Sequence, residues 1–197
     1  MGEATRRRQE EARLRATVLE GLSGDALKVA TTAISLFERF VLPRRYTGGC
    51  YLTTMFLSRF LREEHGIAAE PVVGYVNDGT DDIFVSHAWL EFDGLKTDLT
   101  LNVVEHAHAV PNGAALVLDR VLREGKVRHS YHVAITEVGL AQNQAMMAIP
   151  DLRAIMLHKE QEHSDMLARA ATPQAMAEYM DTAPPGLRYE DMRQAVA

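Results

Sequence analysis

Hydrophobic positions in the first third of the chain recur at helical spacing. A polar segment over about residues 4–22 carries one thin apolar stripe, which predicts a helix that packs along one edge. Residues 25–41 place apolar side chains at alternating spacings of three and four, so we expect an amphipathic helix that Pro43 ends. Residues 50–65 are apolar on more than one side and stop at Gly66, which predicts a central helix.

The hydrophobic period changes to two after this helix. Residues 69–76 and 83–92 predict strands separated by a polar turn. The pair Asp93-Gly94 is a favoured two-residue hairpin turn, and residues 95–100 return as a third strand. Two strands joined in this way predict an antiparallel sheet.

The second half of the chain predicts more elements of both kinds. We expect a helix over about residues 113–124 and a strand over about 126–138. From about residue 150 the pattern is helical, with breaks at Pro173 and at the Pro-Pro-Gly run 184–186. The whole predicts one α+β domain over residues 1–197, with extra helices at both ends. Its core spans about 25–140, and a helical C-terminal appendage spans about 150–197.

Composition narrows the class of protein. A hydrophobic content of 47% is enough for a real core, and no segment approaches the roughly 20 apolar residues of a membrane span. With one cysteine and no apolar N-terminal leader, we expect a soluble protein of a reducing compartment, the cytoplasm, with no membrane partner. The net charge of −6 argues against nucleic acid as a partner.

The only cysteine, Cys50, follows a pair of glycines. Thr47 predicts a helix cap, and Gly48 and Gly49 allow backbone angles that are closed to other residues. Cys50 is thereby placed in the first turn of a helix, where the positive end of the helix favours a thiolate over a thiol. This position predicts a nucleophile. The alternative is a small buried hydrophobic residue, which is the commoner role of a lone cysteine.

The predicted hairpin supplies a base for such a nucleophile. If the Asp-Gly pair forms the whole loop, Trp89 faces Asp98 and His87 faces Thr100. His87 and Asp98 are then diagonal neighbours on one face of the sheet, so the carboxylate can hold one imidazole nitrogen and direct the other toward a thiol. The alternative is a half-buried histidine that only bonds to Asp98. Nucleophile, base and orienting acid are the three roles that thiol acyl transfer needs.

At these residues the chain resembles a known family. The Gly-Gly-Cys run, the segment 65–75, the His-Ala-Trp run 87–89 and the Asp-Leu-Thr run 98–100 are similar to the transglutaminase-like superfamily. The resemblance covers roughly residues 44–102. It implies a papain-like α+β core in which a helix that carries cysteine packs on an antiparallel sheet.

The same resemblance implies roles for three residues. Cys50 would be the nucleophile, His87 the general base and acid, and Asp98 the residue that orients the imidazole. The Gly-Gly-Cys run is also similar to arylamine N-acetyltransferases, and the His-Ala-Trp run to the compact leader peptidases of lasso-peptide maturation.

Other residues are expected to serve the substrate. The N–H of Cys50 and the hydroxyl of Tyr46 are our candidates for binding the oxyanion, although Tyr46 can equally anchor its loop. Gly49 and Trp89 complete the set of predicted substrate contacts.

We expect neither a metal nor a cofactor. His106 and His108 alternate as strand residues do, but no third ligand is evident nearby. His158 and His163 are expected to face solvent.

Seven of the nine methionines follow residue 145. Methionine suits adaptable surfaces, so this region is open to three roles: a lid, a peptide groove or a homodimer contact. Ordinary helix packing is the alternative.

Taken together, these features predict thiol-dependent acyl-enzyme chemistry on a peptide, protein or small amide. Hydrolysis, as in a cysteine peptidase or amidase, is the first hypothesis, because no second acceptor site is identified. Acyl transfer to an amine, as in transglutaminases or N-acetyltransferases, is the second. The third is a non-catalytic binding module that retains the fold.

Overall fold

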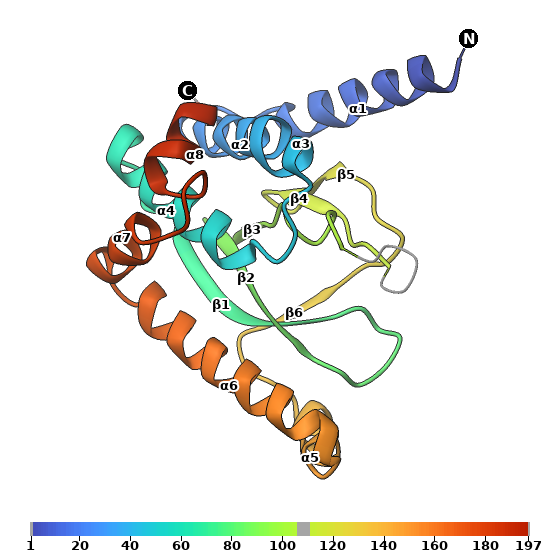
Figure 1. Ribbon diagram of the computed structural model, residues 1–197. Helices are drawn as coiled ribbons and strands as arrows, with labels where there is room; N and C mark the ends of the chain where they lie inside the picture. Colours follow the sequence, from blue (N-terminus) through green and yellow to red (C-terminus); the bar gives the residue numbers. More distant parts are fainter. Residues whose placement is uncertain (1, 106–110, 197) are drawn as a thin grey trace.

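The computed structural model describes residues 2–105 and 111–196, which form a mixed α+β fold (Figure 1). The elements in chain order are α1 (Glu3–Leu19), α2 (Gly24–Leu36), the π-helical turn η1 (Phe37–Val41), α3 (Leu42–Arg44), α4 (Cys50–His65), β1 (Glu70–Asn77), β2 (Val85–Phe92), β3 (Leu95–Thr97), β4 (Ala115–Val117), β5 (Arg120–Arg123), β6 (Ser130–His132), α5 (Glu137–Met147), α6 (Pro150–Ala170), α7 (Pro173–Asp181) and α8 (Tyr189–Val196). Among these described helices, none is long and apolar enough to cross a membrane.

The helical path that begins with α2 runs further than the sequence predicts. It continues without a break through η1 into α3, so the prediction that Pro43 ends the helix is wrong. Pro43 lies in the first turn of α3, where the missing N–H of proline is tolerated. The path ends at Arg45, which has a positive φ of 48°.

Helix α4 is central, as predicted. It runs from Cys50 to His65 and ends at Gly66, whose φ of 67° is left-handed and whose N–H bonds to the carbonyl of Arg62. The segment just before β1 is bonded to α4 at Ser58, whose hydroxyl donates to the carbonyl of Ala69 at 2.8 Å. The buried residues of α4 are Cys50, Tyr51, Leu52, Thr53, Thr54, Met55, Phe56, Leu57, Ser58, Phe60 and Leu61.

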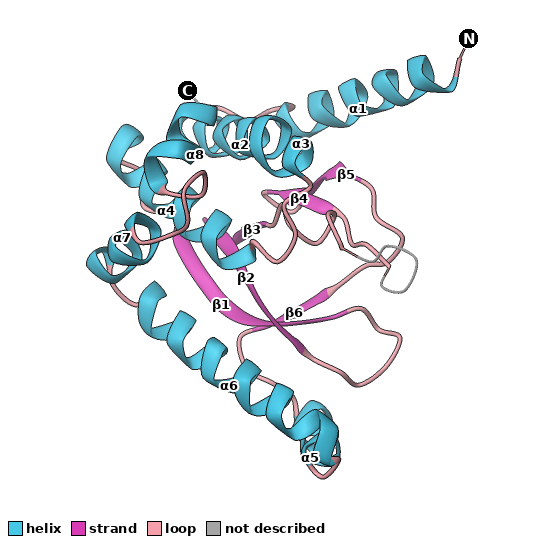
Figure 2. Ribbon diagram, in the orientation of Figure 1, coloured by secondary structure: helices cyan, strands magenta, loops and turns pink. Residues whose placement is uncertain are grey.

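A curled antiparallel sheet of four strands lies against α4 in the order β3-β2-β1-β6 (Figure 2). The predicted hairpin register is confirmed, because Phe92 pairs with Leu95 and Leu90 pairs with Thr97. Asp93 and Gly94 have φ values of 52° and 74°, as a type I′ turn requires. The third strand is shorter than predicted, because the chain leaves β2 after Thr97.

The predicted helix over residues 113–124 is wrong, since a second hairpin, β4–β5, occupies this segment. Its turn consists of Leu118 and Asp119, with φ values of 51° and 58°. The hairpin is joined to the main sheet by an antiparallel bridge. In this bridge the N–H of Asp98 donates to the carbonyl of Leu116 at 2.9 Å, and the N–H of Leu116 returns the bond at 2.7 Å.

The predicted strand over residues 126–138 contracts to the three residues of β6. Helix α5 already begins at Glu137, because Thr136 caps it by accepting a hydrogen bond from the N–H of Gly139 at 3.2 Å.

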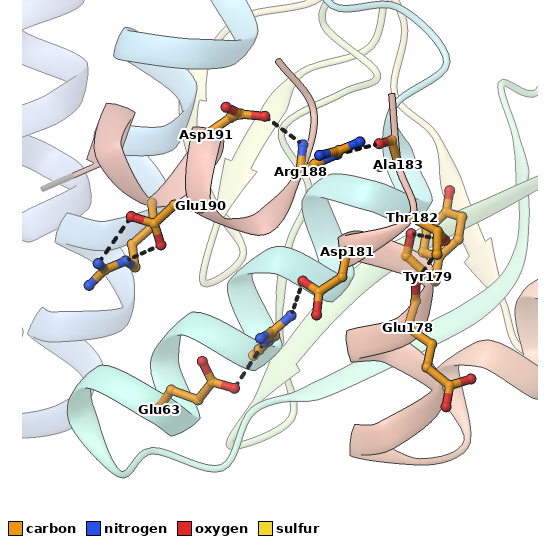
Figure 3. Close-up of polar contacts among 11 residues, drawn as sticks. Glu63, Glu178, Tyr179, Asp181, Thr182, Ala183, Arg188, Glu190 and Asp191 are labelled. Carbon is orange, nitrogen blue, oxygen red and sulfur yellow. Dashed lines mark hydrogen bonds and ion pairs between the residues drawn. The ribbon is translucent and has the colours of Figure 1, made fainter. Parts of the chain in front are cut away.

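The C-terminal region is helical, as predicted, and its last two helices share the hydrophobic core of the rest of the chain. Met176, Met180 and Met192 are buried there, so these three methionines pack as ordinary core residues. Arg59 of α4 donates to Glu63 and to Asp181 of α7, each at 2.9 Å (Figure 3).

The loop before α8 is closed by its own polar contacts. The guanidinium of Arg188 donates to the carbonyl of Ala183 at 3.1 Å, and the backbone N–H of Arg188 donates to the Asp191 carboxylate at the same distance (Figure 3). These bonds fix the chain that leads from α7 into α8.

Candidate active site

Cys50 is the first residue of α4 and is 8% exposed. The chain reaches it through Gly48, whose φ of 67° explains the glycine at that position. The predicted cap at Thr47 is wrong, because the N-cap residue is Gly49. Glycine has no side chain that could bond the N–H groups of the first turn, so these donors are left for another acceptor.

The imidazole of His87 and the carboxylate of Asp98 form a buried pair. The Nε2 atom of His87 lies 2.7 Å from Oδ2 of Asp98, and the two residues are 6% and 2% exposed. The same Oδ2 accepts a hydrogen bond of 3.0 Å from the hydroxyl of Tyr131. Oδ1 accepts from the N–H and the hydroxyl of Thr100, at 3.1 and 3.2 Å. Both carboxylate oxygens are therefore held in place.

Electrostatics favour the charged forms of this pair. Burial alone would lower the pKa of His87, but the charges of Asp98 and Cys50, together with hydrogen bonds to both, raise it to about 10. Burial works against ionisation of Asp98 as well, yet the charge of His87 and the hydrogen bonds from His87, Thr100 and Tyr131 hold its pKa below the usual value. The pair is thus an imidazolium and a carboxylate near neutral pH.

The structure brings His87 and Asp98 together, as the hairpin register predicts, and Cys50 begins α4, the helix that packs against β2. The charge of the Cys50 side chain is among the causes that raise the pKa of His87, so the sulfur lies near the imidazole. Since Nε2 is engaged by Asp98, Nδ1 is the ring nitrogen that remains for the sulfur. Activation of a thiol requires the order sulfur, imidazole and carboxylate.

Tyr46 and Gly49 lie against each other beside the cysteine. A methyl group added at Gly49 would come within 2.1 Å of the Tyr46 ring, and φ at Gly49 is −89°. Gly49 is therefore required by the ring and not, as predicted, by an unusual backbone angle. Burial, followed by the charges of Tyr179 and Cys50, raises the pKa of Tyr46 to about 12, so its hydroxyl remains a hydrogen-bond donor.

Trp89 does not offer a surface to a substrate. It is 1% exposed, and its indole N–H donates to the Glu91 carboxylate at 2.8 Å. Its ring meets the edge of the Tyr131 ring, with centroids 5.1 Å apart. Trp89 thus supports the tyrosine that holds Asp98, which corrects the prediction of a substrate contact.

Sequence reasoning missed a second chain of polar contacts, next to His87 and Cys50. The hydroxyl of Tyr51 lies 2.7 Å from that of Ser86, and Ser86 also bonds to Nδ1 of His163 on α6. The His163 ring stacks on Tyr75 with centroids 4.4 Å apart, so the prediction that it faces solvent is wrong. No local sequence signal marks these contacts, because they join residues far apart in the chain.

The remaining histidine predictions have different outcomes. His158 is exposed, as predicted. His106 and His108 lie outside the described residues. Among the residues that are described, no three His, Cys, Asp or Glu side chains are grouped as metal ligands.

Comparison of the chain with protein-family models, curated proteins and solved structures gives no significant match.

Proposed function

We propose that the chain is a thiol-dependent hydrolase of amide or peptide bonds, with a transglutaminase-like, papain-like catalytic core. The observation that carries the proposal is the buried pair of His87 and Asp98, 2.7 Å apart, next to the only cysteine of the chain, whose charge helps to raise the pKa of His87. If the bond between His87 and Asp98 were purely structural, it would not need the thiol that lies near His87 at the start of α4. Cys50, His87 and Asp98 thus have the chemistry of a nucleophile, a base and an orienting acid, in that order.

The reaction follows from these positions. The Cys50 thiolate attacks the carbonyl carbon of the substrate and forms a C–S bond. When the tetrahedral intermediate collapses, the C–N bond breaks and His87 gives its proton to the leaving amine. His87 then takes a proton from water, which attacks the thioester carbon. The C–S bond breaks, the acid product is released, and the thiolate of Cys50 and the protonated imidazole of His87 are restored.

Oxyanion stabilisation is assigned to the start of α4. The backbone N–H of Cys50 lies in the first turn of the helix, where N–H groups have no partner within the helix. The hydroxyl of Tyr46 is the proposed side-chain donor, since its ring is held against Gly49 beside the cysteine. Loss of one such donor costs roughly a hundredfold to a thousandfold in turnover.

The test is alkylation of Cys50 with iodoacetamide at a series of pH values. Because Cys50 is the only cysteine, a single added mass in the intact protein reports its reaction. An ordinary free thiol, with a pKa of about 8.5, reacts roughly a hundredfold more slowly at about pH 6.5 than when fully ionised. We expect the wild-type protein to keep most of its rate at that pH, and His87→Ala and Asp98→Asn to lose it.

The matched control is His158→Ala, an exposed histidine on α6, which should alkylate like the wild type. Circular dichroism and urea unfolding of each variant show whether the fold is retained. Ordinary thiol behaviour in the wild type, or an unchanged rate in folded His87→Ala protein, would overturn the proposal and favour a non-catalytic binding module. Trapping the acyl-enzyme with an activated ester, then offering water or a primary amine, distinguishes hydrolysis from acyl transfer.

A further inference from the structure

A cavity of about 220 Å³ lies on the sheet next to His87. Its floor includes Val76 and Val85, which pair across β1 and β2, while His87 pairs with Gly74 two positions further along. Residues paired across two strands lie on the same face, so the imidazole and this apolar floor are neighbours. Ligand pockets typically start at about 300 Å³, so this cavity has room for one side chain and not for a larger molecule.

The outer end of the cavity is acidic. Asp78 and Asp81 line it from the connection between β1 and β2, which forms a long loop beyond the sheet (Figure 1). Hydrogen bonds from the hydroxyl and the N–H of Thr80, at 2.7 and 2.9 Å, lower the pKa of Asp78. The carboxylate of Asp81 accepts from the N–H of Ile83 at 2.8 Å. The loop thus holds both carboxylates at the mouth.

No lysine or arginine of the described chain pairs with this end. Neither Asp78 nor Asp81 forms an ion pair with a lysine or arginine of residues 2–105 or 111–196. His129 also lines the cavity; burial lowers its pKa, while the charge of Asp78 acts to raise it. The cavity therefore combines the imidazole of His87, apolar side chains, and two carboxylates that pair with no lysine or arginine of the described residues.

The lining also indicates which part of a substrate enters. It includes His87 but not Cys50, so the cavity lies on the side of the base. In thiol acyl transfer the leaving amine must approach the base to receive its proton, whereas the acyl group stays with the sulfur. From Gly74, opposite His87, to Asp78 is four residues of chain, or about 13 Å at strand rise. An extended basic side chain together with its neighbouring peptide unit can bridge most of this distance.

We propose that this cavity binds the residue on the amine side of the scissile bond and selects a side chain with an apolar stem and a cationic end, as in lysine or arginine. This inference rests on the proposed function for the assignment of the amine side. The preference for a cation rests only on the two carboxylates and the apolar side chains that line the cavity.

Binding can be measured apart from chemistry in the Cys50→Ala protein. The probes are butylguanidinium, pentanoate and 1-pentanol, which share a short apolar stem and differ in charge. The readout is an NMR titration that follows the imidazole signals of His87 and His129. We expect butylguanidinium to bind more tightly than both other probes. Asp78→Asn and Asp81→Asn should each weaken its binding by up to roughly fivefold, the worth of a partly exposed charge pair.

The matched control is Asp93→Asn, which removes an equal charge from the exposed turn between β2 and β3 and should leave binding unchanged. Equal affinity for 1-pentanol and butylguanidinium, no shift at either histidine, or unchanged binding in the Asp78 and Asp81 variants would overturn the cationic preference. Selective binding in a protein whose wild-type Cys50 reacts as an ordinary thiol would instead overturn the proposed function and the amine-side assignment. The two failures are therefore distinguishable.

Discussion

The hydroxyl of Tyr51 lies 2.7 Å from the hydroxyl of Ser86. Tyr51 follows Cys50 on α4, and Ser86 precedes His87 on β2, so the bond joins helix and strand one residue away from the proposed nucleophile and base. Burial raises the pKa of Tyr51, which keeps its hydroxyl protonated. The bond thereby ties the start of α4 to β2 next to both proposed residues.

Replacing Tyr51 by Phe removes this bond while the ring stays in place. We expect a loss of about 0.5–1.5 kcal/mol in the free energy of unfolding, the usual worth of a buried neutral hydrogen bond. Alkylation of Cys50 should also slow, because helix and strand are less firmly aligned. Urea unfolding and intact-mass alkylation measure the two effects. Tyr75→Phe is the control, since among the described residues the Tyr75 hydroxyl has no hydrogen-bond partner; equal results for both variants would contradict the prediction.

Tyr131 is expected to matter for the charge on Asp98. Its hydroxyl donates to the Asp98 carboxylate at 3.0 Å, and hydrogen bonds to charged groups contribute about 1.5–3 kcal/mol. Tyr131→Phe should therefore lower the free energy of unfolding by that amount, as measured by urea unfolding. Thr100→Val removes only one of the two Thr100 bonds and should cost less. A Tyr131→Phe protein as stable as the wild type would show that the carboxylate does not depend on this donor.

The His87–Asp98 pair predicts that stability falls as the solution becomes alkaline. The folded-state pKa of His87 is raised to about 10, against about 6.5 for an ordinary histidine. Between these values the folded protein binds a proton that the unfolded chain has released, so the contribution is complete below about pH 6.5 and is lost as pH rises through about 10. Asp98 acts in the opposite sense, because its lowered pKa gives stability that is lost on acidification.

Urea unfolding at several pH values between about 6.5 and 10 checks the alkaline part of this prediction. The slope of unfolding free energy against pH should be smaller in Asp98→Asn than in the wild type, since the variant lacks the charge that raises the pKa of His87. His158→Ala should retain the wild-type slope. Parallel slopes for the wild type and Asp98→Asn would show that the pair contributes no linked proton.

The cost of replacing Gly49 is predicted to depend on the neighbouring ring of Tyr46. Gly49→Ala places a methyl group 2.1 Å from the Tyr46 ring, while φ at this position suits any residue. We expect a cost of about 1–3 kcal/mol, typical of overpacking. In a Tyr46→Ala background the same change should cost almost nothing. A double-mutant cycle by urea unfolding measures the coupling, and equal costs in both backgrounds would exclude the ring as the cause.

Local signals in the sequence account for the parts of the fold that carry Cys50 and His87. The Asp93-Gly94 turn fixes the hairpin register, because only residues that accept a positive φ form a type I′ turn cheaply. Gly48 and Gly66 likewise mark the approach to α4 and its end, where both have positive φ. Such positions constrain the backbone through their own chemistry and need no distant partner.

The β4–β5 hairpin is not visible in the sequence in the same way. Residues 113–124 are rich in helix-forming side chains, and the turn at Leu118 and Asp119 lacks glycine and asparagine. The hairpin depends on a distant contact, the bridge between Asp98 and Leu116. That bridge also explains why the site itself was only partly predictable. The sequence pattern identifies Asp98 as a candidate. The strand that bonds to its backbone, β4, lies in a segment that the sequence predicts to be helical.

Helix α6 is mostly exposed to solvent, because only Met166 is buried among its 21 residues. It lies with α5 along one border of the molecule, far from α1 (Figure 1). Little apolar area resists its detachment, so its amides should exchange with deuterium by local opening long before those of α4. Each such opening would release Ser86 from His163 while the core stays folded. Exchange of the α6 amides that is faster than that of α4 would therefore report on how firmly Ser86, next to His87, is held.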